Sequence, residues 1–378
     1  MDPGPPAIAS ASGQRWLALD AFRGLSVAGM ILVNNPGSWS YVYPPLAHAE
    51  WHGWTPTDLI FPFFLFAVGV SMTLSFQRRL AEGAGRAALL RKITGRALVI
   101  VGLGLFLNGF PTYHLATMRF PGVLQRIGVV YLVAAAAYVL LPARGQRRLA
   151  AGLLLGYWAA MSLVPIPGVG AGSLTVDANL AQYLDSLLFA GHMWKPTWDP
   201  EGLLSTVPAV ATCLLGAFAG DWLASPRDGR DKALGLFVAG AVAMVAGWVW
   251  SIWFPINKNL WTSSYVLLTG GFAALILAWL YVVIDLRGWR RWAGPLYVYG
   301  SNALLVFVGT GLFARALNLL TVTGPDGAPQ PLKVLIYQRG FASWAGPLNG
   351  SLAFAVAFVL LWLVIMAVPY RYRFFFKV

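Results

Sequence analysis

The chain has 378 residues, of which 58% are hydrophobic and only 11% are charged, and its mean hydropathy is +0.65. These values lie outside the range of soluble globular proteins and indicate a polytopic membrane protein. The formal net charge of +13 would point to nucleic acid in a soluble chain. Here the basic residues form short clusters between apolar stretches, so we interpret them as topology signals and expect no nucleic-acid partner. The single cysteine, Cys213, excludes a disulfide framework within one chain.

Residues 1–14 are rich in Pro, Gly, Ala and Ser and have neither a basic start nor an apolar core. They predict a disordered tail rather than a cleaved signal peptide. The remainder, residues 15–378, is predicted to form one all-α transmembrane domain. A helix needs about 20 apolar residues to cross the bilayer, and the sequence contains ten candidate spans. They cover residues 17–36, 56–77, 93–110, 121–141, 148–165, 203–223, 233–254, 260–285, 293–314 and 350–369.

The basic residues test this order of spans. Ten spans place 19 of the 27 Lys and Arg residues in the termini and loops of one side, and only five in the loops of the other. Because Lys and Arg accumulate on the cytoplasmic side, both termini are predicted to be cytoplasmic. All four histidines then fall on the outer side. Two long outer loops, near 166–202 and 315–349, are expected to cover a pocket that opens outward.

The first span carries polar groups that hydrocarbon disfavours. Asp20 and Arg23 are three residues apart, so on a helix they can neutralise each other, or Arg23 can anchor a phosphate-bearing cofactor. Asn34 and Asn35 stand at the outer end of the span, before Pro36 and Gly37. They can end the helix, or hold a substrate carbonyl or orient a neighbouring histidine.

The loop between the first two spans contains the chemistry that a transfer reaction needs. His48 can act as a base or accept an acyl group near neutral pH. Asp58 can cap the second span or orient His48. His48 and His52 are four residues apart, but HAEWH is not the H-E-x-x-H pattern and no third ligand is evident, so no metal site is expected.

Further polar groups lie at later spans. Gln125 and Arg126 fall one turn inside the fourth span, where a buried charge needs an acidic partner or a ligand. The segments 199–202 and 257–261 precede the sixth and eighth spans on the outer side, and serve either as polar caps or as parts of a site.

Five blocks along most of the chain resemble the heparan-α-glucosaminide N-acetyltransferase family, including its prokaryotic members. In order, they are FRGLSVAGMILVNNPG, LAHAEWHGWTPTDLIFPFFLF, FPGVLQRIGVVY, DPEGLLSTVPA and NKNLWTSSYVLLTGGFA. The resemblance implies transfer of an acetyl group from cytoplasmic acetyl-CoA to a terminal glucosamine amine across the membrane. It maps the active histidine onto His48, whereas His52 stands where relatives can carry Asn.

The sequence thus predicts a membrane acyltransferase, expected in the bacterial cytoplasmic membrane, with acyl-CoA, an amino sugar or glycan and the lipid bilayer as partners. The oligomeric state stays open, a homodimer included. The alternatives are a sugar transporter and an O-acyltransferase of envelope polysaccharide. The predicted catalytic residues are His48, Asp58 and Asn34, and the predicted cofactor-binding residues are Arg23, Asp20, Gln125 and Arg126.

Overall fold

The computed structural model describes residues 16–324 and 328–376, and the predicted tail of residues 1–14 lies outside these ranges. The helices are α1 (Leu17–Asn34), η1 (Pro44–Leu46), η2 (Pro56–Leu59), α2 (Ile60–Ala81), α3 (Arg86–Gly109), α4 (Val123–Leu140), α5 (Ala143–Leu163), α6 (Leu180–Phe189), α7 (Leu203–Ala224), α8 (Gly229–Trp250), α9 (Ser263–Leu280), η3 (Tyr281–Leu286), η4 (Arg291–Ala293), α10 (Gly294–Ser301), α11 (Ala303–Leu319), α12 (Leu332–Tyr337), η5 (Gln338–Ala342) and α13 (Ser343–Arg371).

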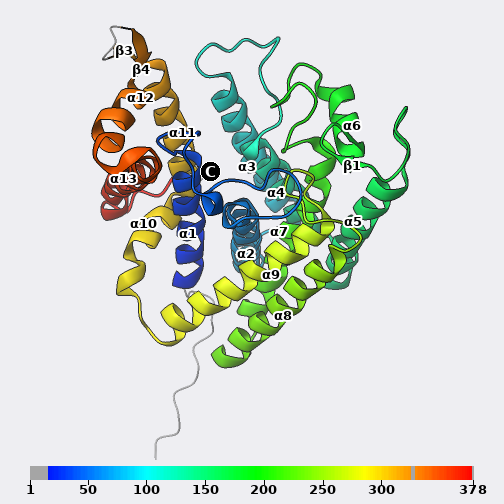
Figure 1. Ribbon diagram of the computed structural model, residues 1–378. Helices are drawn as coiled ribbons and strands as arrows, with labels where there is room; N and C mark the ends of the chain where they lie inside the picture. Colours follow the sequence, from blue (N-terminus) through cyan, green and yellow to red (C-terminus); the bar gives the residue numbers. More distant parts are fainter. Residues whose placement is uncertain (1–15, 325–327, 377–378) are drawn as a thin grey trace, which may run out of the picture.

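Strands are limited to two short antiparallel hairpins. One pairs β1 (Leu174–Thr175) with β2 (Ala178–Asn179), and the other pairs β3 (Thr321–Thr323) with β4 (Pro329–Pro331). Figure 1 shows α1 and α2 in the middle of the bundle, with α10 to α13 on one side and α3 to α9 on the other. The predicted all-α class is confirmed.

Each of the ten predicted spans corresponds to a long helix or to a pair of consecutive helices. Within the described ranges, seven helices are long and apolar enough to cross a membrane, or eight if the bent pair of α10 and α11 counts as one span. Helices α3 and α5 are 24 and 21 residues long, but both begin with several basic residues. The protein is therefore an integral membrane protein, while ten crossings with cytoplasmic termini stay a prediction.

The predicted span 293–314 is broken rather than continuous. Helices α10 and α11 meet at Asn302 with a bend of 74°. The buried Asn302 side chain donates to the Phe374 carbonyl oxygen at 3.0 Å and accepts from the Phe376 amide at 2.8 Å. The side-chain amide thus pairs with the backbone of the C-terminal segment, which holds that segment against the break.

Small residues bring the central helices close together. Helix α2 packs on α7, and their closest approach is at Gly69 and Gly216. A Cβ atom at Gly69 would lie 2.0 Å from the Cys213 carbonyl oxygen, and one at Gly216 would lie 2.0 Å from that of Phe66. In lipid the hydrophobic effect does not drive helices together, and small residues such as these glycines allow the helix backbones to pack closely. This contact fixes α2, which begins at the candidate site.

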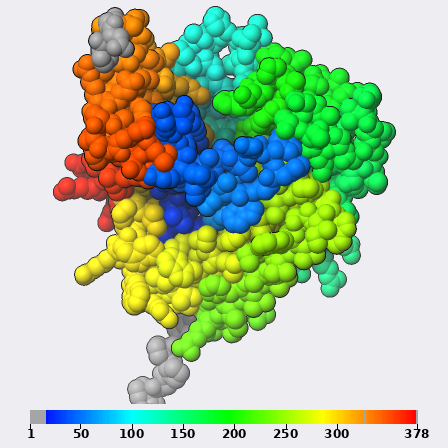
Figure 2. All heavy atoms as spheres, in the orientation of Figure 1, coloured from blue at the N-terminus to red at the C-terminus, as the bar shows by residue number. Residues whose placement is uncertain are grey.

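The loop between α1 and α2 carries His48 and leads into the η2 turn that carries Asp58. Figure 2 shows this segment, in blue, lying across the middle of the viewed face between the orange and green regions. The predicted outer loop 166–202 folds into β1, β2, α6 and the connection to α7. Trp194, Trp198 and Glu201 of this connection line the cavity beside His48, as expected for a covering loop.

Candidate active site

The start of α2 places the carboxylate of Asp58. Thr55 and Asp58 form a capping box at η2, in which the Asp58 Oδ2 atom accepts from the Thr55 amide at 3.0 Å. The same oxygen accepts from the Ala49 amide at 3.1 Å. Both expected roles of Asp58 hold together, because its other oxygen faces His48. The cap fixes the carboxylate, which is only 1% exposed.

His48 and Asp58 form a hydrogen-bonded pair, with 2.7 Å between Nδ1 of the imidazole and Oδ1 of the carboxylate. An ionised carboxylate can only accept, so the Nδ1 proton is directed at Asp58 and the lone pair of the neutral ring lies on Nε2. The His48 side chain is 46% exposed, whereas that of Asp58 is buried. In this pair the buried Asp58 orients the imidazole, and the more exposed His48 is the base that faces a cavity.

Lys258 is a site residue that the sequence analysis did not single out. It lies in the loop between α8 and α9, and its Nζ atom is 3.0 Å from His48 Nδ1, 3.1 Å from Nε2 and 3.7 Å from Asp58 Oδ1. Burial lowers the pKa of this ammonium, although Asp58 opposes the shift. The Asn257–Trp261 block was noted as a cap or a part of a site, and the second role fits the position of Lys258.

His52 holds the loop rather than facing a cavity. The Asn257 side-chain amide donates to His52 Nδ1 at 3.3 Å, and the Gly53 amide donates to the Ile256 carbonyl oxygen at 2.8 Å. Burial lowers the pKa of His52, which agrees with a neutral ring that accepts this bond. Within residues 16–324 and 328–376, no three His, Cys, Asp or Glu side chains gather as a metal ion would need.

A cavity of about 510 Å³, here called the histidine cavity, lies against His48. Its polar wall includes His48, Asn34 and Lys258, and its apolar wall includes aromatic side chains from α2 and α11. Asn34 thus reaches the cavity, whereas Asn35 is buried and its amide donates to the Ile31 carbonyl oxygen at 2.8 Å. Of the two asparagines, Asn34 is the one that lines the histidine cavity.

A second cavity of about 220 Å³, here called the inner cavity, lies toward the end of the bundle that holds the C-terminal segment. Arg23, Arg96 and Phe376 line it. Arg23 Nη1 is 3.6 Å from Asp20 Oδ1, and its Nη2 donates to the Gly300 carbonyl oxygen at 2.5 Å. The expected pair with Asp20 therefore exists, and Arg23 also faces a cavity. The apolar side chains that line both the inner and the histidine cavity are Phe64, Leu124, Ile127 and Leu304.

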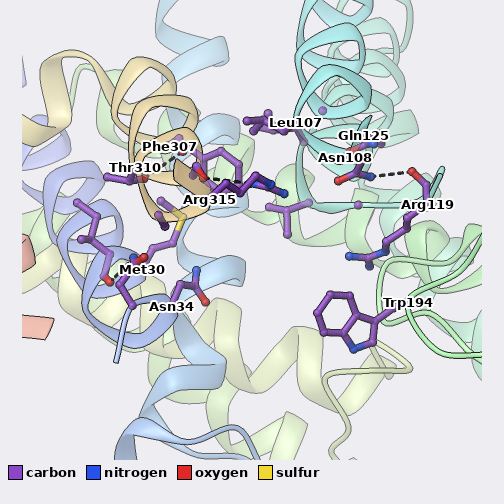
Figure 3. A pocket seen from close by; sticks show the side chains of 18 of the residues that line it. Met30, Asn34, Leu107, Asn108, Arg119, Gln125, Trp194, Phe307, Thr310 and Arg315 are labelled. Atoms are coloured by element: carbon purple, nitrogen blue, oxygen red, sulfur yellow. Dashed lines mark hydrogen bonds between the residues drawn. The ribbon is translucent and has the colours of Figure 1, made fainter. Parts of the chain in front are cut away.

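A third cavity of about 390 Å³, here called the arginine cavity, is lined by Arg119 and Arg315. Figure 3 shows Arg315 reaching in from one side and Arg119 and Trp194 facing it from the other. Arg119 donates to both oxygens of Asp199, at 2.6 and 2.7 Å, and also pairs with Glu201. Its charge is thus matched by two carboxylates of the 199–202 segment.

The two predicted neighbours Gln125 and Arg126 point to different places. Gln125 lines the arginine cavity. Arg126 is 2% exposed, donates to Thr206 Oγ1 at 3.2 Å and to Ser205, and lies over the Trp261 ring at 5.0 Å. It lines none of the three cavities described above. Its contacts indicate that it ties α4 to the first turn of α7.

Arg119, Lys258 and Arg315 are among the charged cavity residues that the sequence analysis did not single out. One signal was available: Arg119 and Lys258 are two of the five basic residues that the predicted topology places on the outer side. They oppose the general distribution of charge, which favours a local role over a topological one.

Residues 15–247 match the family model described as the catalytic region of heparan-alpha-glucosaminide N-acetyltransferase. The chain belongs to this family. Heparan-alpha-glucosaminide N-acetyltransferases of Mus musculus and Homo sapiens are each 31% identical to it over 362 residues, which cover 80% of this chain and 54% of the relative. The chain therefore spans about half the length of these curated relatives.

The region that matches the heparan-alpha-glucosaminide N-acetyltransferase family contains His48, Asp58, Arg119 and Glu201. It ends before Lys258, which the fold brings to the same cavity. The family region is described as catalytic, and the three cavities adjoin helices within it, so the histidine cavity is the candidate active site.

Proposed function

We propose that this protein transfers an acetyl group from cytoplasmic acetyl-CoA to the amine of a glucosamine-like sugar on the outer side of the membrane, with His48 as the reacting base. The observation that carries the proposal is the His48–Asp58 pair on the wall of a cavity that shares four apolar side chains with an arginine-lined inner cavity. The distribution of Lys and Arg supports the proposed orientation, with both termini on the acetyl-CoA side.

The inner cavity suits the phosphate-bearing end of acetyl-CoA. Arg23 and Arg96 both line it, and guanidinium groups bind phosphate through several donors. The apolar side chains between the inner and histidine cavities offer a path for the pantetheine arm. Small rotations of Phe64 and Leu304 would bring the thioester within reach of His48 Nε2. The carrier then stays on the cytoplasmic side while its acyl group is presented outward.

The chemistry balances with groups that line the histidine cavity. The lone pair of the acceptor amine forms the new C–N bond at the thioester carbon. His48 Nε2 takes the proton that the amine nitrogen loses. Asp58 stabilises the resulting imidazolium through Nδ1. Collapse of the tetrahedral carbon breaks the C–S bond, and the departing thiolate takes the proton from Nε2. The alternative order, in which Nε2 first accepts the acetyl group, uses the same atoms.

Lys258 and Asn34 complete the site as hydrogen-bond donors. Lys258 Nζ lies against the imidazole ring, 3.0 Å from Nδ1 and 3.1 Å from Nε2. From there its flexible side chain can reach the oxygen of a thioester bound beside His48. A positive donor there stabilises the negative charge that develops on that oxygen in the transition state.

The test uses purified full-length protein, radiolabelled acetyl-CoA and a glucosamine glycoside. Replacing a general base of this kind costs roughly 10²- to 10⁴-fold in rate, so His48→Ala should reduce acetyl transfer by at least about a hundredfold. His114→Ala is the matched control, because His114 is exposed and lines none of the three cavities. Unchanged turnover in His48→Ala would contradict the proposal. Sugar movement into proteoliposomes without acetyl transfer would favour a transporter instead.

A further inference from the structure

Arg126 is a buried cation that the chemistry proposed above does not use. It lines none of the three cavities. Within residues 16–324 and 328–376, no carboxylate forms a salt bridge with it, and its Nη1 atom has no hydrogen-bond partner. A buried charge without an acidic partner is costly to the fold, so we looked for a role of Arg126 beyond stability in its contacts.

The first contact is with the indole of Trp261. The guanidinium carbon of Arg126 lies over this ring, 5.0 Å from its centroid. The indole is buried, and its Nε1 atom donates to Thr212 Oγ1 at 3.1 Å. Phe61 packs edge-on to the same indole, with 5.0 Å between the ring centroids. A cation, a hydroxyl group and a second aromatic ring thus fix the position of the indole.

Trp261 in turn closes the turn that carries Lys258. The Trp261 amide donates to the Lys258 carbonyl oxygen at 3.1 Å, and Trp261 has a φ of +52°. A bulky residue keeps this left-handed conformation only where surrounding contacts hold it. The buried Asn257 side chain braces the turn, since its Oδ1 atom accepts from the Leu260 amide at 2.9 Å. A shift of the indole would therefore move the backbone of Lys258.

The second contact of Arg126 is with the segment before α7. Its Nη2 atom donates to the Gly202 carbonyl oxygen at 3.2 Å. Gly202 follows Glu201, which lines the histidine cavity as Lys258 does. One buried guanidinium thus links the two segments that bring Glu201 and Lys258 to the candidate active site.

The charge of Arg126 also acts on Lys258. Burial is the main cause that lowers the pKa of the Lys258 ammonium. The positive charge of Arg126 lowers this pKa further, whereas the carboxylates of Asp58 and Glu201 raise it. The His48 imidazole also lies against Nζ, at 3.0 and 3.1 Å. Because like charges disfavour each other, Arg126 makes the Lys258 proton easier to lose.

We propose that Arg126 is a positioning residue of the acetyl transfer, which holds the turn of Lys258 against His48 through the Trp261 ring. A guanidinium suits this role because it combines a flat surface for stacking with several donors at its edges. Cofactor binding is the role predicted from the sequence, whereas these contacts direct Arg126 at the loop of Lys258. The inference rests on the proposed function, because it takes Lys258 to act on the thioester oxygen.

The experiment compares Arg126→Met and Arg126→Lys with the wild type in acetyl transfer. Methionine is an unbranched apolar side chain that adapts to irregular core space. The Ser205 and Thr206 hydroxyl groups already donate to the Gly202 carbonyl oxygen, so that acceptor stays satisfied without the arginine. Arg126→Met should lower kcat by at least about tenfold, because a misplaced Lys258 stabilises the transition state less. The KM of both substrates should change by less than about twofold.

The pH profile gives a readout that a purely structural role would not move. In Arg126→Met the fall of kcat/KM on the alkaline side should move to higher pH, because the charge that lowers the pKa of Lys258 is gone. Arg126→Lys should recover part of the rate and keep this fall at the wild-type pH, because an ammonium keeps the positive charge near the indole. An alkaline fall that stays at the wild-type pH in Arg126→Met would overturn the inference.

A double-mutant cycle tests whether Arg126 acts through Lys258. In the Lys258→Met background, Arg126→Met should lower kcat by less than about a further twofold, because coupled residues are not additive. A further loss of about tenfold in that background would overturn the inference, because the two residues would then act independently. A raised KM for acetyl-CoA with unchanged kcat in Arg126→Met would assign Arg126 to the donor and also overturn it.

Tyr138→Phe is the matched control. The Tyr138 hydroxyl donates to Asp221 Oδ1 at 2.7 Å, so it also ties α4 to α7, but Tyr138 lines none of the three cavities. This variant should leave the alkaline fall unchanged. A fall that moves to higher pH in Tyr138→Phe would show that looser packing of α4 on α7 is sufficient for the effect, and would contradict a specific role of Arg126.

Direct titration of Lys258 separates this inference from the proposed function. Purified protein is treated with acetic anhydride at a series of pH values, and mass spectrometry of the peptide that contains Lys258 measures how much of its amine has reacted. The reaction needs the neutral amine and no turnover. A pKa of Lys258 that is higher in Arg126→Met than in the wild type and Arg126→Lys would support the link even if acetyl transfer were absent. Equal pKa values in the three proteins would refute it.

Discussion

Asp58 is fixed before any substrate binds, because two backbone amides and the His48 imidazole surround its carboxylate. The Tyr265 hydroxyl also donates to the Asp58 backbone carbonyl at 2.5 Å, which ties the start of α2 to α9. A carboxylate held in this way sets the tautomer and the direction of the imidazole. The residue that remains adjustable is Lys258, whose long side chain ends beside both groups.

Lys258 leads to a prediction about pH. Its ammonium is charged below its pKa, and burial lowers that pKa. If the positive charge stabilises the developing oxyanion, kcat/KM should fall on the alkaline side at a lower pH than an ordinary lysine would cause. In Lys258→Arg the alkaline fall should move to higher pH, because a guanidinium stays protonated. Lys258→Met should lower kcat/KM by roughly a hundredfold or more at pH values below this pKa, and the difference from the wild type should shrink above it.

The measurement is the pH dependence of kcat/KM for acetyl transfer, with pH profiles of the three proteins compared in the same detergent. Lys195→Met is a suitable control, since Lys195 is an outer-loop lysine that lines none of the three cavities. An alkaline fall that stays at the same pH in Lys258→Arg would assign it to another group.

At the scale of the elements, the site depends on how closely α2 and α7 approach. The η2 turn that leads into α2 carries Asp58, and the segment before α7 carries Glu201, which lines the histidine cavity. The reciprocal contacts of Gly69 and Gly216 leave no space for a side chain on either helix.

Gly216→Leu should therefore destabilise the protein and widen this contact. A side chain at Gly216 would meet the Phe66 backbone, which cannot rotate away, and forced overpacking costs about 1–3 kcal/mol or more. The thermal midpoint of the detergent-solubilised protein measures the effect. Gly156→Leu on α5 is the matched control, because nothing lies within 4 Å of a Cβ there. Equal midpoints for the two variants would show that the α2–α7 contact tolerates separation.

The break between α10 and α11 is a second feature of this scale. It turns the chain so that residues of α11 line the arginine and histidine cavities, while Ser301, Asn302 and Ala303 line the inner cavity. A continuous helix would place these side chains along a single straight face. The break thus lets one segment of chain contribute to the walls of all three cavities.

At the scale of the whole molecule, the cavities follow one another from the C-terminal segment to the outer loops. Helix α8 is only 22% buried in its most apolar window, which suits a helix that faces lipid. The functional groups are collected instead around α1, α2, α4 and α11. This arrangement separates the arginine-lined inner cavity, near the C-terminal segment, from the histidine cavity, which bears His48 and Lys258.

The arrangement predicts that donor and acceptor react from opposite sides of a membrane. Proteoliposomes with acetyl-CoA on the side of the termini should acetylate a membrane-impermeant glucosamine glycoside on the side of the His48 loop. The reverse placement of the two substrates should give transfer reduced by about tenfold or more, because the arginines of the inner cavity face only one side. Protease accessibility of an N-terminal tag establishes the orientation. Equal transfer in both placements would contradict the predicted sidedness.

The amino-acid sequence determined the helical class and the position of nearly every long helix, because hydrophobic run length depends on consecutive residues alone. The sequence also determined that His48 and Asp58 lie close together, because they are ten positions apart in one short loop that ends in the capping box. The break at Asn302 escaped prediction because it depends on Phe374 and Phe376, more than 70 residues away.

Only the tertiary structure decided which polar residues share a cavity. Lys258 is 210 residues from His48, and Arg119 is 80 residues from Asp199, so no local pattern could pair them. Gln125 and Arg126 are neighbours in sequence, yet successive residues of a helix point about 100° apart, which sends one into the arginine cavity and the other toward α7. The sequence indicated candidate site residues by their local chemistry, but helix packing decided which of them lie together in one site.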